Sequence, residues 1–216
     1  MSHTEWWASE SFWRKTAIWV TAGSFVALIF LTLDSMSAIT AGSKRVPAYS
    51  VINQRIDYVF DEKRNFQVPV IVVEEPLFGK KLTEAEAEAL VSHGKLTTQA
   101  KNCMNCHTLL GNGAYYAPDL TKSWLDPSWG SKEVREQQMV EFLMNPQDRL
   151  HNGIGRRMPN LGITEAEARA TVAFLKWMSS IDTNGFPYNF KSIDQSDPPP
   201  AEVPAVNGSP VQQQGG

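Results

Sequence analysis

Two cysteines and a histidine within five residues form the most specific chemical pattern in the chain. Residues 103–107 read Cys-Met-Asn-Cys-His, and Cys103 and Cys106 are the only two cysteines. Thiols at this spacing can each form a thioether to one porphyrin, and His107 then lies at one axial face of the iron. A zinc site would need two further ligands, and a thioredoxin-like pair would follow a strand in a βαβ pattern. The sequence shows neither, and it predicts one covalent haem c.

The second axial ligand must come from elsewhere in the chain. Met158 lies in the irregular stretch Arg-Arg-Met-Pro-Asn, residues 156–160, where Pro159 stiffens the backbone at a fixed φ. A loop there can fold over the haem face opposite His107. His/Met ligation raises the reduction potential and leaves no open coordination position, which suits electron transfer. We therefore predict Met158 as the sixth ligand, with His151 as the second candidate.

The other histidines and methionines have simpler explanations. His93 lies on the helix predicted to lead into the motif, Met104 is held between the two cysteines, and His3 precedes the predicted membrane segment. Three methionines fall on predicted helices, where such side chains fill core gaps: Met139, Met144 and Met178.

Two arginines precede Met158. A guanidinium can pair with a haem propionate in a fixed fork, and the alternative is a solvated surface patch. We expect only one of Arg156 and Arg157 to bind a propionate, and we assign that contact to Arg157.

An apolar segment near the N-terminus is long enough to be a membrane anchor. Residues 16–33 carry no charge, and tryptophans beside the basic pair Arg14-Lys15 precede them, as a membrane interface favours. Continued through Ala41, the segment reaches the roughly 20 residues that a bilayer requires. We predict a transmembrane helix over residues 16–41. The alternative is a cleaved signal peptide, whose apolar region is shorter.

Charge alone does not orient this segment, because Arg14 and Lys15 on one side are matched by Lys44 and Arg45 on the other. Haem attachment to Cys-x-x-Cys-His is completed outside the cytoplasm. We therefore expect a cytoplasmic segment over residues 1–15 and a periplasmic haem domain.

Helices are expected on both sides of the haem motif. The capping boxes Thr83–Glu86 and Thr164–Glu167 each open a helix, and the first runs to about Lys101. The second carries one apolar stripe, and a third helix over residues 131–144 stops before Asn145-Pro146. The sequence thus predicts a mainly α c-type cytochrome domain over residues 81–190. The stripe consists of Ala170, Ala173, Phe174, Trp177, Met178 and Ile181.

The remaining segments carry weaker signals. Residues 67–73 are β-branched and suit a short strand that Pro69 confines to an edge. Helical spacing is found before them, in Ile52, Ile56, Val59 and Phe60. We expect residues 42–80 to be a periplasmic connector or small subdomain, and the proline-rich residues 191–216 to be disordered. The net charge of −3 argues against a nucleic-acid partner.

Two longer stretches are similar to one known family. Residues 107–120, His-Thr-Leu-Leu-Gly-Asn-Gly-Ala-Tyr-Tyr-Ala-Pro-Asp-Leu, closely resemble the haem-binding segment of the small, membrane-anchored cytochrome c subunit of bacterial nitric oxide reductase. Residues 174–184 resemble that family's C-terminal signature. Gly-Lys-Leu at 94–96 and Arg-Met-Pro at 157–159 also fit, whereas residues 42–80 and the tail are longer than in that family.

The resemblance implies an electron-transfer subunit of a complex in the bacterial inner membrane, not itself catalytic. It implies a soluble periplasmic donor, either a cytochrome c or a cupredoxin. It also implies a large multi-helix partner that carries b haems and non-haem iron and reduces NO to N2O. The alternatives are a membrane-anchored cytochrome c that serves another respiratory oxidase, and a haem-based gas sensor with an open distal site.

The resemblance further implies calcium at the subunit boundary. In that family the glycine and tyrosine of Gly-Ala-Tyr offer backbone carbonyls to the ion, and by position these are Gly113 and Tyr115. Carbonyl oxygens suit calcium. The alternative is a glycine turn under the haem edge.

Overall fold

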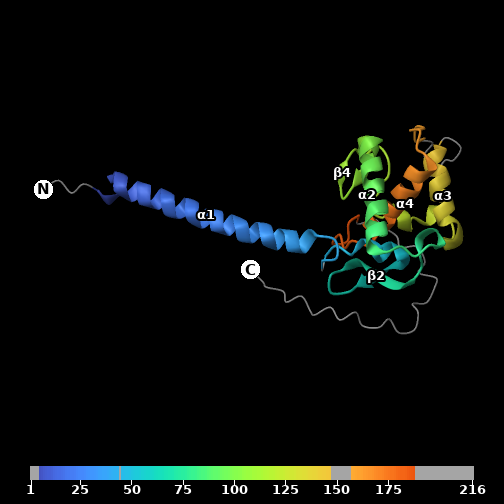
Figure 1. Ribbon diagram of the computed structural model, residues 1–216, viewed down its shortest axis with the longest axis horizontal. Helices are drawn as coiled ribbons and strands as arrows, with labels where there is room; N and C mark the ends of the chain where they lie inside the picture. The colour runs from blue at the N-terminus through green and yellow to red at the C-terminus, as the bar shows by residue number, and fades with distance from the viewer. Residues whose placement is uncertain (1–4, 44, 147–156, 188–216) are drawn as a thin grey trace. The chain divides into compact units, whose positions relative to one another are not determined.

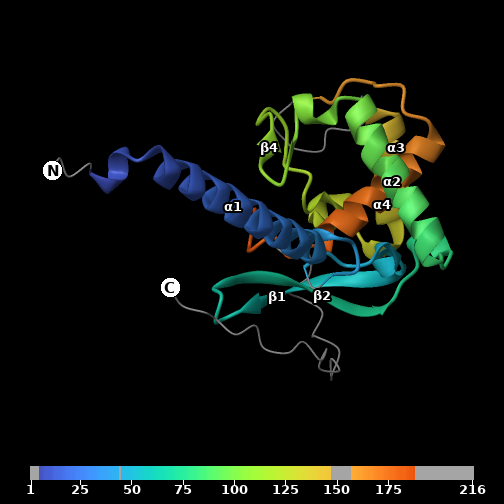
Figure 2. The same ribbon diagram turned by 60° about the vertical axis from the view of Figure 1, so that its left-hand side comes forward.

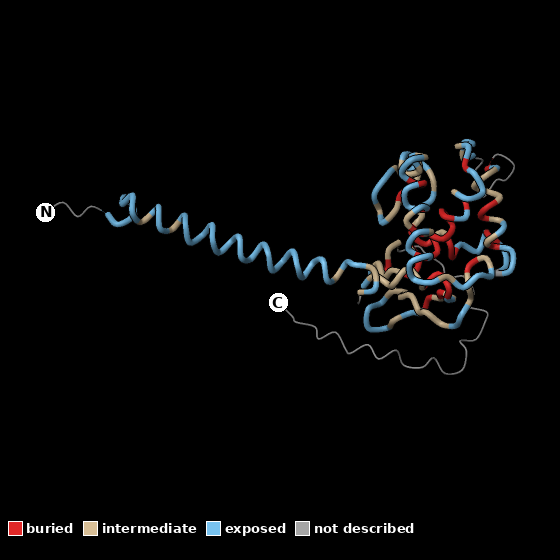
Figure 3. Tube along the Cα trace, viewed as in Figure 1, coloured by how far each residue is buried: buried red, intermediate tan, exposed pale blue. Residues whose placement is uncertain are grey.

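The first of two compact units in this computed structural model is dominated by one long helix. The structure describes residues 5–43, 45–146 and 157–187, and the chain divides into units 1–46 and 47–216. Helix α1 (Glu10–Ile39) has 30 residues, none of them buried, and is exposed along its length in Figure 3. By length and composition it can cross a membrane. It begins before the predicted residue 16 and includes Phe12, Trp13 and the basic pair Arg14-Lys15.

The second unit is mainly helical and contains two small antiparallel hairpins (Figures 1 and 2). Its helices are α2 (Glu84–Ala100), α3 (Lys132–Met144) and α4 (Glu165–Ser179). Its strands are β1 (Gln54–Asp61), β2 (Phe66–Glu74), β3 (Thr108–Leu109) and β4 (Asn112–Gly113). Short 3-10 turns are found at Tyr49–Asn53, Leu77–Gly79, Cys103–Asn105, Ser123–Leu125 and Pro127–Trp129.

Both predicted capping boxes are confirmed, and they fix where α2 and α4 begin. The Thr83 hydroxyl accepts a hydrogen bond from the Glu86 amide at 3.3 Å, and the Glu86 carboxylate accepts one from the Thr83 amide at 2.8 Å. Thr164 and Glu167 repeat this arrangement at α4. Each box satisfies two amides that the first helical turn would leave unpaired.

Helices α2 and α4 cross with their backbones in contact. A Cβ on Gly94 would lie 2.0 Å from the Ala170 carbonyl oxygen and 2.8 Å from the Phe174 Cβ. Only a residue without a side chain permits this approach. The crossing brings the end of α2, which leads into the haem motif, to α4, which follows the Met158 segment.

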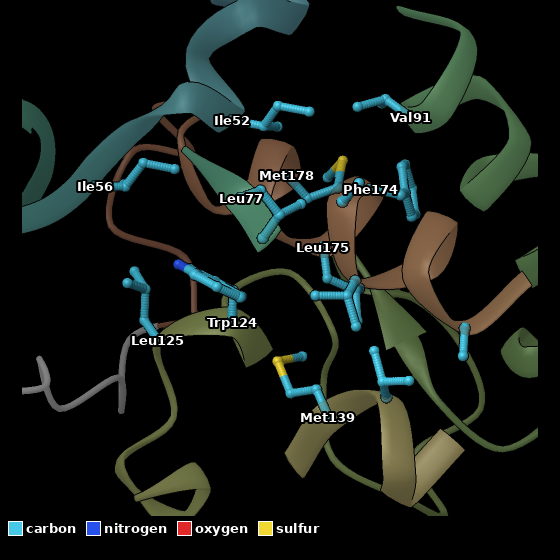
Figure 4. Close-up of a cluster of buried hydrophobic side chains, with 14 of the residues drawn as sticks. Ile52, Ile56, Leu77, Val91, Trp124, Leu125, Met139, Phe174, Leu175 and Met178 are labelled. Carbon is cyan, nitrogen blue, oxygen red and sulfur yellow. The ribbon is translucent and has the colours of Figure 1, made fainter. Parts of the chain in front are cut away.

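Helix α4 is the centre of the core and is buried on more sides than the predicted stripe. Phe174, Leu175 and Met178 point into the cluster shown in Figure 4, together with Leu77 and Trp124 from other segments. The stripe prediction missed the opposite side, where Val172 and Lys176 have no exposed surface. A helix enclosed by neighbours has no exposed face for polar residues to mark.

The first hairpin overturns the helical spacing expected before residue 61. Ile56 and Tyr58 lie on β1, which pairs with β2 and places Ile71 and Pro69 opposite them. The side chains of Ile56 and Tyr58 are buried. The Tyr58 hydroxyl donates to the Ser179 carbonyl at 2.6 Å, so the hairpin packs on the end of α4. Buried residues of the segment 47–80 therefore share one hydrophobic core with helices α2, α3 and α4.

The predictions made for His151, Arg156, Lys44 and the tail over residues 191–216 lie outside the described residues.

Candidate haem site

A cavity of about 440 Å³ brings the predicted haem residues together. Cys103, Cys106, His107, Arg157 and Met158 all line it. Its walls are largely apolar, and a volume of this size lies within the usual range of cofactor pockets. The apolar wall residues include Trp129, Met139, Phe142, Leu143, Leu161 and Leu175.

A sharp turn after α2 aims the motif into this cavity. Asn102 adopts a left-handed conformation with φ of 54°, which asparagine tolerates better than most residues. The 3-10 turn Cys103–Asn105 follows, and the His107 amide donates to the Cys103 carbonyl at 3.0 Å. The turn places Cys103, Cys106 and His107 together in the cavity lining, as attachment to a single porphyrin requires.

The His107 ring is oriented by a backbone carbonyl. Its Nδ1 lies 2.7 Å from the Pro118 oxygen. Since a carbonyl can only accept, this contact assigns the proton to Nδ1 and leaves the Nε2 lone pair for a metal. Histidine ligands of metals usually donate their other ring N–H in this way. The arrangement therefore fits the proximal ligand of a haem iron.

Met158 reaches the cavity from a different part of the chain. It is partly buried and packs against the hydrophobic core. The segment between Met158 and α4 is connected to α2 through Lys101, whose Nζ donates to the Gly162 carbonyl at 3.1 Å and lies 3.6 Å from the Glu167 carboxylate. A thioether in the wall of a cavity that also holds the imidazole fits the predicted sixth ligand.

The alternatives of a redox pair and a zinc site find no support in this geometry. Burial raises the pKa of the Cys103 thiol, whereas reactive cysteines of redox pairs have lowered pKa values. Within residues 5–43, 45–146 and 157–187, no three His, Cys, Asp or Glu side chains form a metal cluster. The cavity also contains a buried polar atom without a hydrogen-bond partner, the hydroxyl oxygen of Thr171.

The two residues predicted to bind calcium are not among the described residues that line the cavity. A Cβ on Gly113, whose φ is 122°, would lie 2.2 Å from the His107 carbonyl oxygen, so glycine is required there by close packing alone. Tyr115 is 81% exposed, and its hydroxyl donates to the Gly111 carbonyl at 3.1 Å. These contacts fit the alternative glycine turn, and calcium stays a prediction.

Sequence reasoning missed two features of the site. The Pro118 carbonyl has no side-chain signature that could have marked it as the partner of His107. Met139, expected in the core, is 1% exposed and also lines the cavity. His93, which we did not predict to be a ligand, is exposed on α2.

The turn of the Cys-x-x-Cys-His motif, the oriented imidazole and the crossing of α2 with α4 define a c-type cytochrome domain. Residues 91–179 match the family model of cytochrome c, which implies covalent haem c. The chain belongs to the family of nitric oxide reductase C subunits.

Three relatives support this membership. The C subunit of nitric oxide reductase from Stutzerimonas stutzeri is 35% identical over 117 residues, 53% of this chain and 76% of that protein. Its counterpart from Paracoccus denitrificans is 36% identical over 112 residues, 51% and 73% of the two chains. The counterpart from Halomonas halodenitrificans is 30% identical over 105 residues, 48% and 68%.

Proposed function

We propose that this chain is the electron-transfer subunit of a nitric oxide reductase. It takes electrons from a soluble periplasmic cytochrome c or cupredoxin and delivers them to a b haem of the catalytic subunit, which reduces NO to N2O. The observation that carries this proposal is that Met158 and His107 line the same apolar cavity. A site with both axial positions filled by protein suits electron transfer rather than binding of a gas.

The residues around the cavity have separable tasks. We assign thioether attachment to Cys103 and Cys106, and axial ligation to His107 and Met158. Arg157, which is exposed and lines the cavity, is placed to bind a propionate. When bound, the haem supplies a one-electron carrier. The apolar walls exclude water, which favours a high reduction potential.

The membrane anchor and its orientation are part of this proposal. Helix α1 crosses the inner membrane with the N-terminus in the cytoplasm, because haem attachment to Cys103 and Cys106 requires the second unit to be periplasmic. The aromatic side chains of Trp6, Phe12 and Trp13 form edge-to-face contacts with centroids 4.8 Å and 5.4 Å apart. Such a cluster suits the interface of a bilayer. Calcium carried by the Gly113 and Tyr115 carbonyls is proposed for the boundary with the partner.

The partner is tested by purification of the full chain from native membranes. We expect it to co-purify with a large subunit that carries b haems and non-haem iron, measured by pyridine haemochrome spectra and iron analysis. The isolated chain is expected to have no NO turnover. Turnover by the isolated chain, or co-purification with an oxidase that lacks non-haem iron, would overturn the proposal.

The gas-sensor alternative is tested on the isolated haem-loaded chain. His/Met ligation predicts a low-spin spectrum with a weak ferric band at about 700 nm and little CO binding by the reduced protein. High-affinity binding of CO or NO to the reduced chain would favour a sensor, because it requires an open distal position.

A further inference from the structure

The loop that holds the proximal histidine is closed by a series of hydrogen bonds to a second segment. Residues 106–110 run beside residues 117–121. The Ala117 amide donates to the Cys106 carbonyl at 2.8 Å, and the Leu120 amide donates to the Thr108 carbonyl at 2.8 Å. The contact between His107 and Pro118 lies between these two bonds. The position of the Pro118 carbonyl therefore depends on what holds residues 117–121.

The carboxylate of Asp119 makes the central side-chain contacts of this loop. One of its oxygens accepts from the Thr108 hydroxyl at 2.6 Å, and the other accepts from the Thr121 amide at 2.8 Å. The Thr121 hydroxyl in turn accepts from the Leu110 amide at 2.7 Å. Hydrogen bonds to a charged acceptor are roughly twice as strong as neutral ones.

Asp119 is half-buried, and both threonines that it or its loop contacts are buried. Thr108 is 2% exposed and Thr121 has no exposed surface. Lys122, 3% exposed, lies with its Nζ 4.4 Å from the centre of the Tyr58 ring. Burial lowers the pKa of this lysine to about 8, while attraction to Asp182 and Asp119 opposes that shift and favours the charged form. A buried cation near Asp119 offsets part of the cost of holding a carboxylate there.

We propose that Asp119 is a positioning residue for the proximal haem ligand: by bridging Thr108 and Thr121 it holds the Pro118 carbonyl against His107 Nδ1 and thereby lowers the reduction potential. The inference rests on His107 as a ligand. A short, fixed N–H···O contact makes the imidazole more basic, and a more basic ligand stabilises the ferric state. Loosening the loop weakens that contact and raises the potential.

The test compares variants of the full-length, haem-loaded chain in detergent. Asp119→Ala removes both contacts, and Thr108→Val removes one while keeping the side-chain shape. Asp119→Asn is the conservative variant, because its amide can accept from the Thr121 amide and donate to the Thr108 oxygen. Glu86→Ala is the matched control, since Glu86 also accepts from a threonine amide and its hydroxyl but lies in the cap of α2.

Two measurements report on the imidazole rather than on stability. In Asp119→Ala we expect the His107 Nδ1 proton to exchange with solvent at least about tenfold faster by NMR. We expect the ratio of reduced to oxidised haem at the wild-type midpoint to rise up to about tenfold, which is about 59 mV for a one-electron couple. Thr108→Val and Asp119→Asn should fall between wild type and alanine, and Glu86→Ala should match wild type in both.

The outcomes separate this inference from the assignment of ligands. An Asp119→Ala protein that is less stable but keeps the wild-type exchange rate and potential would overturn the positioning role. If that variant does not accumulate with haem, the same two measurements on Thr108→Val decide. The wild-type spectrum tests His/Met ligation independently, so failure there contradicts the proposed function and not the loop.

Discussion

The two segments that carry His107 and Met158 to the haem cavity, here called the His107 side and the Met158 side, are built in different ways. On the His107 side, contacts join residues close in sequence: the loop of residues 106–121 is closed on itself by hydrogen bonds. On the Met158 side, the segment before α4 is tied to α2, through Lys101 and the Gly162 carbonyl. The first side is a local structure, and the second exists only when helices distant in sequence have packed.

This difference indicates how each side responds to change. Substitutions in the loop should alter the properties of the His107 ligand directly, whether or not they also lower global stability. Substitutions at the crossing of α2 and α4 should alter stability first and the Met158 side with it, because Lys101 at the end of α2 contacts the Gly162 carbonyl and the Glu167 carboxylate. Four predictions test this contrast.

Removal of the Met158 sulfur should have the largest effect. In Met158→Leu we expect the ferric band at about 700 nm to disappear, CO to bind the reduced protein, and the potential to fall on the order of 0.1 to 0.2 V, within the ~0.8 V range that axial ligands span. Redox titration and absorption spectra measure this. Met139→Leu, at another methionine of the cavity wall, should keep the band. A low-spin Met158→Leu protein with an unchanged potential would exclude Met158 as the ligand.

Gly94→Ala tests whether the Met158 side depends on the helix crossing. The added methyl group would meet the Ala170 carbonyl at 2.0 Å, so the helices must separate. We expect a loss of about 3 kcal/mol in the free energy of unfolding, and loss of the ferric methionine band at lower temperature than in wild type. Denaturant titration followed by spectroscopy measures both. The exposed neighbouring change Lys95→Ala should cost less than about 0.5 kcal/mol.

Two buried lysines, one near the His107 loop and one on α4, allow the two regions to be compared through the pH dependence of stability. Burial lowers the pKa of both Lys122, near the His107 loop, and Lys176, on α4, from 10.5 to about 8. The unfolded chain therefore binds more protons than the folded chain above pH 8. The free energy of unfolding should rise from about pH 8 to pH 10, by roughly 1 kcal/mol per pH unit for each lysine.

Replacing one lysine at a time shows how much each region contributes to the pH dependence of the free energy of unfolding. Lys176→Met and Lys122→Met should each remove about half of it, as denaturant titrations across the pH range would measure. A flat profile in wild type would mean that neither lysine is desolvated in the folded protein.

Lys101→Met should give the smallest effect. It removes the hydrogen bond to Gly162 and the partly exposed ion pair with Glu167. We expect a loss of about 1 kcal/mol in stability and faster dissociation of Met158, measured by the rate of cyanide binding to the ferric protein. The exchange rate of the His107 ring proton should not change. If it increases as much as cyanide binding does, the two sides are not independent.

The parts of the fold that sequence could predict are those specified by residues close together. The capping boxes at Thr83 and Thr164 fix the starts of α2 and α4, and Cys103–His107 contains the whole attachment motif. Met158 was predicted from its irregular surroundings and lies in the cavity wall, while its ligation stays a prediction.

The predictions that were wrong or incomplete concern residues whose environment depends on segments far apart in the sequence. Ile52 and Ile56 are separated as on a helix, but the first lies in a 3-10 turn and the second on β1, so the spacing spans two elements. Lys176 was expected outside the apolar stripe, yet it is fully buried because the Glu75 carbonyl accepts from its Nζ at 3.0 Å and the Trp124 ring lies 5.2 Å away. A buried environment of this kind for a lysine forms only when segments distant in sequence pack together.

The close approach at Gly94 also has a consequence for the order of folding. A loop of about ten residues closes within about 100 ns. A contact between two helices that are far apart in the sequence must overcome a larger loop-closure entropy. The His107 loop can therefore form while α2 and α4 are still apart. We expect pulsed hydrogen exchange during refolding of the haem-bound chain to protect the Leu120 amide before the amides of α4.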